Sequence, residues 1–301
     1  MNNLPPTANR VLISVNPKSG ARSSVDRAER LGELLEAEGL HAEILSDLDE
    51  VGEKAGDYHR QGWLRALVAC GGDGTVAELA NRTEPGVPLT ILPAGNENLL
   101  ARYLNLGHSP DELCRTIVGG RLRRLDAGKA AGRLFLLMIG CGFDAEVVRQ
   151  LHRHRTGHVR NLSYLKPILA AIRSYKYPEI RVYCDDKPTP GVRARWVFAF
   201  NLPCYGGGLQ LAPDASGSDG RLDVCSFEHG SLWHGLRYTA AVLLRRHRRL
   251  RDCDIRRAAR LRIESDEEVP YQLDGDPGGT LPVEVEILPD RLTMIVPEDE
   301  K

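Results

Sequence analysis

The segment Gly71-Gly72-Asp73-Gly74-Thr75 combines three glycines with an acid and a hydroxyl group. The apolar run Ala66–Ala69 precedes it and a helical pattern begins at about Thr75, so a strand-to-helix turn is expected. Glycines let a backbone approach a polyphosphate closely, and free N–H groups at a helix N-terminus bind anions. Thr75 could cap the helix or bond a phosphate, and Asp73 could hold a Mg²⁺ water or orient a hydroxyl. The pattern predicts a polyphosphate site, with an ordinary glycine-rich turn capped by aspartate as the structural alternative.

Neither of two commoner nucleotide-binding motifs explains the glycine pattern of this sequence. It lacks the G-x-x-x-x-G-K-[ST] pattern of P-loop enzymes. Residues 140–145, Gly-Cys-Gly-Phe-Asp-Ala, match a relaxed dinucleotide fingerprint after an apolar strand, but they lie in the β-rich half of the chain. The region roughly twenty residues further on, Ser163-Tyr164-Leu165, has no acid to hold a ribose. An ordinary P-loop enzyme is therefore excluded, and a dinucleotide-binding site is disfavoured.

The elements that would position the glycine turn alternate between strand and helix. Strands are expected at Val11–Val15, His41–Leu45, Trp63–Cys70 and Pro88–Leu92, and helices at Ser24–Glu38, Thr75–Asn81 and from Asn98 to Tyr103. This alternation with short Gly-rich turns indicates an open, mainly parallel sheet in an α/β domain. From about Arg124 the pattern changes to short β-rich runs between Gly, Pro and Asp turns, with one clear helix at about Asn161–Tyr175. This second part predicts a mainly antiparallel domain.

The composition limits the class of protein. A chain of 301 residues that is 42% hydrophobic can bury the cores of two domains. A net charge of -1 gives no global attraction to nucleic acid or to membranes, so local patches must supply any such attraction. No run approaches the roughly 18 apolar residues of a transmembrane helix, and Met1–Asn9 has no apolar signal core. The seven dispersed cysteines, none in a C-x-x-C pair, indicate reduced thiols. We therefore expect a cytoplasmic protein without a nucleic-acid partner.

Five segments stand in a characteristic order along the chain. They are residues 16–20 (Asn-Pro-Lys-Ser-Gly), 71–75, 93–102 (Pro-Ala-Gly-Asn-Glu-Asn-Leu-Leu-Ala-Arg), Tyr205-Gly206-Gly207-Gly208 through Pro213 to Asp219–Asp223, and 273–277 (Leu-Asp-Gly-Asp-Pro). In this order they resemble the motifs of the diacylglycerol kinase catalytic-domain family, which includes bacterial soluble lipid kinases and sphingosine-kinase-like proteins. The resemblance covers nearly the whole chain. It implies an ATP-binding α/β domain of residues 1–127, to which 287–301 return, a β-sandwich domain of residues 128–286, and an active site in the cleft between the two domains.

The same resemblance implies which residues bind ATP. The glycine turn and the first turns of the following helix would contact the phosphates, together with residues that follow three neighbouring strands. These residues are Asn16, Ser46, Gly71, Gly72, Asp73, Gly74, Thr75, Val76, Ala77, Glu78 and Asn96. For Ser46, an ordinary serine at the end of a strand is an equal alternative.

The resemblance also implies a catalytic and a metal site. Asp276 occupies the position of the proton acceptor for the substrate hydroxyl, and Asp274 would orient it or hold a Mg²⁺ water. Asp73 is the second candidate for the proton acceptor. Asp219 matches a ligand of a structural Mg²⁺, which the main-chain carbonyls of Ser216 and Arg221 would complete. Plain turns are the alternative at both places. The implied cofactors are ATP and Mg²⁺, and the implied reaction is transfer of the γ-phosphoryl group to a hydroxyl of a lipid such as diacylglycerol or a sphingoid lipid.

Some positions depart from the family pattern. Asn96 stands where the family has Thr, Leu99 stands where it has a polar residue, and Asp276 stands where it has Glu. These changes would suit a weakened enzyme, so a lipid-binding regulatory protein is one alternative. An NAD-kinase-like enzyme is another, because such enzymes share Gly-Gly-Asp-Gly, although the segment Pro213–Asp223 argues against it.

The run Arg245–Arg251 contains five arginines in seven residues. Such a cluster could bring a soluble enzyme to a lipid substrate in an anionic membrane, and a solvated helix face is the alternative. Tyr164–Ile172 could line an acyl-chain pocket or belong to a core helix. We expect peripheral contact with the inner membrane face, and we leave a homodimer open.

Overall fold

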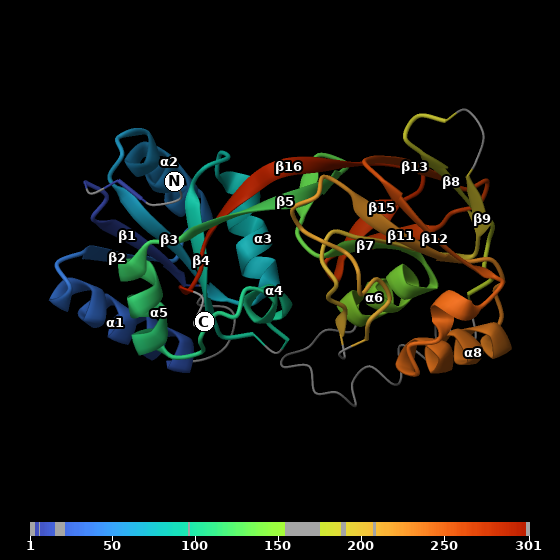
Figure 1. Ribbon diagram of the computed structural model, residues 1–301, viewed down its shortest axis with the longest axis horizontal. Coiled ribbons are helices and arrows are strands. Elements are labelled where there is room, and N and C mark those ends of the chain that lie inside the picture. Colours follow the sequence, from blue (N-terminus) through green and yellow to red (C-terminus); the bar gives the residue numbers. More distant parts are fainter. Residues whose placement is uncertain are drawn as a thin grey trace. The chain divides into compact units, whose positions relative to one another are not determined.

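The computed structural model describes residues 4–5, 7–15, 22–95, 97–153, 175–187, 191–206 and 209–298. The chain divides into two compact units, the first formed by residues 1–126 and 289–301 and the second by residues 127–288. Two strands, β5 (Leu122–Ala130) and β16 (Val283–Ile295), carry residues of both units. In Figure 1 the first unit runs from blue through cyan to the green of α5, and the second from green to orange, with β16 in red.

A parallel sheet forms the centre of the first unit. Its order is β2-β1-β3-β4-β16, and each neighbouring pair is parallel. The strands are β1 (Arg10–Val15), β2 (His41–Leu45), β3 (Leu64–Gly71), β4 (Pro88–Pro93) and the C-terminal part of β16. Strand β3 is buried without interruption from Ala66 to Gly71, as expected where helices cover both faces of a parallel sheet. The predicted α/β domain with a mainly parallel sheet is confirmed.

Helices flank this sheet. They are α1 (Arg22–Ala37), α2 (Leu48–Arg60), α3 (Asp73–Arg82), α4 (Leu99–Tyr103) and α5 (Pro110–Gly119). Helices α1 and α5 pack on one face, where Leu31, Leu35 and Leu113 share a core cluster with Ile13 and Val68 of the sheet (Figure 1). The apolar stripe of α1 therefore has the role that its helical spacing predicts.

Helices α2 and α5 were not predicted from the sequence, although both begin at strong local caps. Asp47 accepts hydrogen bonds from two backbone N–H groups in the first turn of α2, at 2.9 and 3.0 Å. Ser109 and Glu112 form a reciprocal capping box at the start of α5. Such caps each contribute about 1 kcal/mol to helix stability. The buried face of α2 consists of the small residues Val51, Gly52, Ala55 and Gly56, so no large apolar side chain marks it in the sequence.

Two antiparallel sets of strands form the second unit. One has the order β16-β13-β8-β9 and belongs to the same ten-stranded sheet as β1 to β4, in which β6 pairs with β5, and the other is a separate sheet of the order β12-β11-β10-β7-β14-β15. The strands are β6 (Arg133–Phe135), β7 (Met138–Gly142), β8 (Ile180–Cys184), β9 (Val192–Ala194), β10 (Trp196–Phe200), β11 (Leu222–Phe227), β12 (Cys253–Ala258), β13 (Arg260–Glu264), β14 (Pro270–Leu273) and β15 (Asp276–Thr280). Their inner side chains form one cluster that includes Ile139, Val182, Val197, Val224 and Val285. The predicted β-sandwich is confirmed.

The expectation of one clear helix in the second part of the chain is wrong, because α6 (Phe143–Arg153) and α8 (Leu232–Leu243) both lie there. Helix α6 follows β7 without a connecting loop, so no turn marks its start. Helix α8 is apolar around most of its circumference and lacks the 3.6-residue alternation by which surface helices are recognised. Of the helix predicted at 161–175, only Tyr175 lies within the described residues. In the parts of the chain that the structure describes, no helix combines the length and apolar character needed to cross a bilayer.

Candidate active site

The glycine turn after β3 lies against the turn after β4. Gly71 O accepts a hydrogen bond from Ala94 N at 2.9 Å. A Cβ atom on Gly95 would lie 2.8 Å from Gly72 Cα and 2.9 Å from Asn98 Oδ1, so only glycine allows this backbone approach. Both turns are at the carboxyl edge of the parallel sheet, where open α/β sheets bind their ligands.

Asp73 uses its carboxylate to close the N-terminus of the next helix. Oδ2 accepts a hydrogen bond from Leu99 N and Oδ1 accepts one from Leu100 N, both at 2.9 Å. Burial raises the pKa of Asp73, and these two backbone hydrogen bonds lower it. The carboxylate thereby ties the glycine turn to α4. Because the contact uses only the backbone of residue 99, the departure from the family pattern at Leu99 leaves it intact.

Asn98 fixes the turn that carries the predicted phosphate ligand Asn96. Its side chain is buried, its φ is +48°, and asparagine tolerates this left-handed region better than most residues. Oδ1 accepts a hydrogen bond from Gly95 N at 3.1 Å, and Nδ2 donates to Gly95 O at 2.7 Å. Asn96 itself and Asn16 lie outside the described residues.

The N-terminus of α3 is open, in contrast to that of α4. Gly72 is its cap residue, and no side chain caps the helix by a hydrogen bond. Gly74 is exposed, and a Cβ atom on it would meet no described atom within 4 Å. Unpaired N–H groups and the helix dipole favour an anion at such a position. The geometry suits a phosphate group, as the glycine pattern predicts.

The remaining predicted nucleotide residues differ in their exposure. Ser46 is exposed directly after β2, at the same carboxyl edge of the sheet. Val76 is buried in the core, whereas Thr75, Ala77 and Glu78 are half-buried. Only the exposed or half-buried side chains can touch a ligand, so Val76 could contribute no more than its backbone.

In the second unit, three backbone N–H groups hold the carboxylate of Asp274. Leu136 N donates to Oδ2 at 2.6 Å, while Leu137 N and Met138 N donate to Oδ1 at 2.8 and 2.9 Å. Hydrogen bonds to a charged group are roughly twice as strong as neutral ones. Asp274 also has a φ of +52°, which aspartate tolerates in tight turns. These contacts make Asp274 the anchor of the turn between β14 and β15.

Asp276 begins β15, and its side chain is 45% exposed. Its Oδ1 lies 3.2 Å from Nε2 of His152, which comes from α6. A ring N–H that donates to this oxygen would fix the orientation of the carboxylate. Sequence reasoning missed His152, because no motif surrounds it and it lies far from Asp276 in the chain.

Gln272 connects the same turn to a further carboxylate that sequence reasoning did not assign. Its Oε1 accepts a hydrogen bond from Gly275 N at 2.7 Å, and its Nε2 donates to Asp144 Oδ2 at 3.0 Å. Tyr205 donates its hydroxyl proton to the other oxygen of Asp144. Burial raises the pKa of Asp144, and both hydrogen bonds lower it. A Cβ on Gly140 would lie 2.6 Å from Asp144 Oδ2, so the glycine that resembles a dinucleotide motif makes room for this network.

Asp219, the predicted metal ligand, has protein partners at both carboxylate oxygens. Oδ1 accepts a hydrogen bond from Arg221 N at 3.1 Å, and Arg257 donates to Oδ2. Arg257 Nε also lies 3.5 Å from the buried Asp223 Oδ2, and Ser216 is half-buried nearby in the chain. Among the described residues, no three His, Cys, Asp or Glu side chains gather where they could hold a metal ion. Arginine thus supplies the positive charge in this loop, and a Mg²⁺ at Asp219 stays a prediction.

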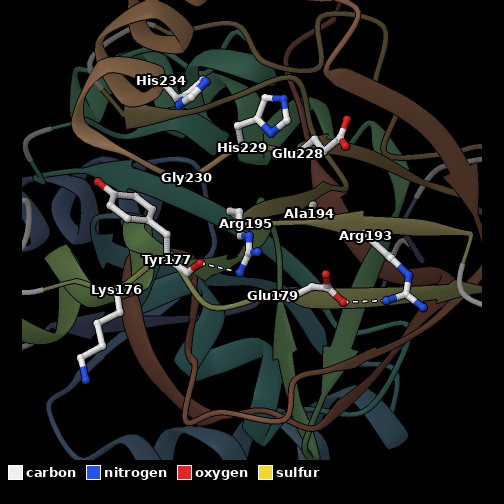
Figure 2. Close-up of a pocket in the computed structure, with 10 residues that line it drawn as sticks. All are labelled: Lys176, Tyr177, Glu179, Arg193, Ala194, Arg195, Glu228, His229, Gly230 and His234. Atoms are coloured by element: carbon white, nitrogen blue, oxygen red, sulfur yellow. Dashed lines mark hydrogen bonds and ion pairs between the residues drawn. The ribbon is translucent and has the colours of Figure 1, made fainter.

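A polar hollow of about 480 Å³ occupies another part of the second unit (Figure 2). Its lining residues are Lys176, Tyr177, Glu179, Arg193, Ala194, Arg195, Glu228, His229, Gly230 and His234. Arg195 is held in the wall by a 2.8 Å hydrogen bond to Tyr177 O, drawn as a dashed line in Figure 2. The hollow adjoins the Gly142 end of β7, whereas the Asp274 turn adjoins the Met138 end. It is therefore separate from the acidic turn, and its charged lining does not suit an acyl chain.

Comparison of the sequence with protein families places both units. Residues 10–130 match the family model described as diacylglycerol kinase catalytic domain, and residues 138–296 match the one described as YegS C-terminal NAD kinase beta sandwich-like domain. A diacylglycerol kinase of Mycobacterium tuberculosis is 28% identical in an alignment of 306 residues that covers 96% of this chain and 95% of that protein.

Two solved structures share the fold. A diacylglycerol kinase from Bacillus anthracis superimposes with a TM-score of 0.67 at 20% identity, covering 96% of this chain and 97% of that one. An NAD kinase from Archaeoglobus fulgidus in complex with ATP is more distant, with a TM-score of 0.52 at 12% identity over 95% of this chain and 92% of that one. Since the two family models together span nearly all of the chain, in the order of its two units, the protein belongs to the diacylglycerol kinase and YegS-like lipid kinase family.

Proposed function

We propose that this protein transfers the γ-phosphoryl group of ATP to a hydroxyl of a lipid, with diacylglycerol or a sphingoid lipid as the substrate class. Membership of the family supports the reaction class, and the name of the Mycobacterium relative supports diacylglycerol. The observation that carries the proposal is the contrast within one turn. Asp274 is bound by three backbone N–H groups, whereas Asp276 keeps a half-exposed carboxylate beside His152.

The first unit would bind the phosphates of ATP. The open N-terminus of α3 presents the backbone of Gly72 to Gly74, and Ser46 is exposed at the same edge of the sheet. Phosphoryl transfer relies mainly on positioning and on electrostatic stabilisation, so a rigid cradle matters more than a reactive side chain. The contacts between the two glycine turns supply that rigidity.

Asp276 would take the proton of the substrate hydroxyl. The alcohol becomes acidic only as the phosphoryl group arrives, so a carboxylate can serve as the acceptor. His152 would hold the carboxylate in one orientation, and Asp274 would hold the turn. Aspartate is one methylene shorter than the glutamate of the family, so the substrate hydroxyl must approach the β14–β15 turn more closely.

Asp73 is the competing acceptor. Each of its carboxylate oxygens already accepts a hydrogen bond from the start of α4. Both oxygens therefore hold the start of α4, and we assign Asp73 a structural role. Mg²⁺, when bound with ATP, would spread the charge of the transferring phosphoryl group.

The test is transfer of label from ATP carrying a radioactive γ-phosphate. Separate reactions would contain diacylglycerol, sphingosine, NAD and a total lipid extract, each with Mg²⁺ and with EDTA, and a reaction without protein would serve as the blank. We expect a labelled lipid that requires Mg²⁺ and no labelled product from NAD. Label in the NAD product alone would establish an NAD kinase. Lipid binding without any transfer would establish a regulatory protein.

A further inference from the structure

Helix α8 carries a row of large apolar side chains that no described residue covers. Trp233 is 80% exposed, Leu244 is 66% exposed and Leu243 is 65% exposed, which are the highest values for large apolar residues in the described parts of the chain. Leu232 and Leu236 are exposed on the same helix. At about 100° per residue these five residues fall on one side, which we call the α8 face. The other exposed large apolar residues, such as Trp63, are scattered, as is normal for soluble proteins.

The opposite side of α8 is firmly packed. The ring of Tyr238 stacks on Phe227 with centroids 4.4 Å apart, and its hydroxyl donates to Asp252 Oδ2 at 2.7 Å. Gly235 lies against Trp196, so close that a Cβ would be 3.2 Å from the indole ring. The helix therefore has its core contacts already, and the α8 face is a second apolar side.

The arginine segment, Arg245–Arg251, follows this face directly. Arg245 has a φ of +54°, and Arg246 N donates to Ala241 O at 2.7 Å, which ends the helix and turns the chain. The buried His247 lies 2.8 Å from Leu211 O through its Nε2 and anchors the turn. The arginines are thus held immediately beside Leu243 and Leu244, the last residues of the α8 face.

Most of the positive charge of this segment is not neutralised by neighbouring acids. Arg248 pairs with Asp214 at 2.6 Å. Arg245, Arg246, Arg249 and Arg251 are exposed, and none of them forms an ion pair with a described residue. An apolar helix side that is bordered by unpaired cations is the arrangement by which helices lie in the interface of anionic membranes.

We propose that the α8 face and the arginine segment together form the surface by which this protein binds an anionic lipid bilayer. Trp233 and the leucines would enter the boundary between headgroups and acyl chains, and the arginines would contact lipid phosphates. Neither contact depends on the kinase chemistry, so the surface would operate even if the proposed reaction were different.

The charge distribution favours a bilayer over a second copy of the chain. In a two-fold symmetric dimer the same patch faces itself, so the arginine segments of both copies would approach each other. Like charges so placed repel, whereas an anionic bilayer supplies the opposite charge over the whole surface. Arginine side chains also reach from a helix end to the headgroup level while their stems stay against apolar groups.

The test is co-sedimentation with vesicles, without ATP or substrate. Vesicles of phosphatidylcholine with phosphatidylglycerol would be compared with vesicles of phosphatidylcholine alone. We expect the parent protein to prefer the anionic vesicles and to lose that preference as salt rises. Trp233→Ser with Leu236→Ser should weaken binding to anionic vesicles more than about tenfold at all salt concentrations, because it removes buried apolar area. Arg245→Gln, Arg246→Gln and Arg249→Gln together should weaken binding by a similar factor at low salt only.

The matched control is Val118→Ser with Arg30→Gln, which removes an exposed apolar residue and an exposed arginine from helices of the first unit. It should bind vesicles as the parent does. All variants should keep the parent melting temperature and their activity on detergent-dispersed substrate, since they lie outside the proposed catalytic residues. A parent that ignores anionic vesicles overturns the proposal. So does a parent that is dimeric in solution and becomes monomeric in the Trp233→Ser variant without vesicle binding, which would assign the α8 face to a second copy.

Discussion

Two acidic turns flanked by glycine, one in each unit, use aspartate differently. In the first unit, the carboxylate of Asp73 accepts hydrogen bonds from the two N–H groups that begin α4. In the second unit, the carboxylate of Asp274 accepts hydrogen bonds from three N–H groups that precede and begin β7. Asp276 has the same side chain, but it is half-exposed and its contact is with one imidazole. A carboxylate can accept a proton from a substrate when it is exposed and not already bound by backbone N–H groups. Its presence in a glycine motif is not sufficient.

The largest expected effect comes from the available carboxylate. Asp276→Asn keeps the shape of the side chain but cannot take a proton, and loss of a general base typically costs a factor of about 10² to 10⁴ in rate. Turnover on the lipid substrate should fall by such a factor, while ATP affinity and melting temperature stay near the parent values. A His152→Gln control, which can still donate to the carboxylate, should lose far less. An Asp276→Asn enzyme with near-parent turnover would remove Asp276 from the mechanism.

The second effect sharpens the contrast between the open N-terminus of α3 and the closed one of α4. Gly74→Val places a branched side chain into the open space above the helix start, where no described protein atom lies within 4 Å of the added Cβ. Because the protein itself has room, the change should lower ATP affinity well over tenfold by crowding the phosphates. Gly119→Val is the matched control, since Gly119 ends α5 with equally open surroundings. Equal ATP affinity of the two folded variants, measured by calorimetry, would place the nucleotide elsewhere.

The third prediction tests whether Asp274 stabilises the β14–β15 turn through its hydrogen bonds. Asp274→Asn tolerates the positive φ of the parent, but its amide nitrogen turns a donor toward backbone N–H groups that need an acceptor. Leaving such a buried donor unpaired costs about 1–3 kcal/mol. Denaturant unfolding should show a loss of that size in the free energy of unfolding. Unchanged stability would show that the three hydrogen bonds are not important to the fold.

The smallest effect extends the comparison to a third acid. If the ion pair with Arg257 is what neutralises Asp219, then Asp219→Ala should lower the melting temperature by the same small amount in Mg²⁺ and in EDTA, because no ion is lost. A structural Mg²⁺ gives a different result. The parent would then be more stable in Mg²⁺ than in EDTA, and Asp219→Ala would abolish that difference.

Local sequence patterns were sufficient to predict the strands and helices of the first unit, which position Asp73. Strand β3 was expected at Trp63–Cys70 and lies at Leu64–Gly71, because a continuous apolar run ended by glycines is a local signal of a buried strand. Alternation of strands with helices in the same region gave the parallel sheet, and with it the common edge of the phosphate site. The order of motifs gave the family.

The contacts of the individual acids could not be predicted from local patterns, because they join distant segments. Asp73 meets the start of α4 only after β3 and β4 have paired, and His152 meets Asp276 only after α6 has packed on β14 and β15. Neither the spacing nor the residue types around Asp73 and Asp276 indicate which distant residue each of them will contact. Arg257 beside Asp219 is a third case, since it comes from a later strand.

The inner side of helix α8 could not be predicted from the sequence, for a different reason. Its sequence is mostly apolar. A helix that is apolar on nearly all sides has no alternation of apolar and polar residues from which its buried side could be predicted. Only the contacts of Tyr238 and Gly235 identify the inner side, and thereby leave Trp233 and its neighbours on the outside.

The central claim is that Asp276 acts in the chemistry while Asp73 acts on the structure. The most direct test is the single-turnover rate of phosphoryl transfer at saturating ATP, measured together with stability for Asp276→Asn and Asp73→Asn. Asp276→Asn should transfer about 10² to 10⁴ times more slowly than the parent at unchanged stability. Asp73→Asn loses one acceptor for the N–H groups of α4, so it should be less stable by about 1–2 kcal/mol and keep the greater part of its rate. The reverse pattern, a fast Asp276→Asn and an inactive but stable Asp73→Asn, would contradict the account and make Asp73 the proton acceptor.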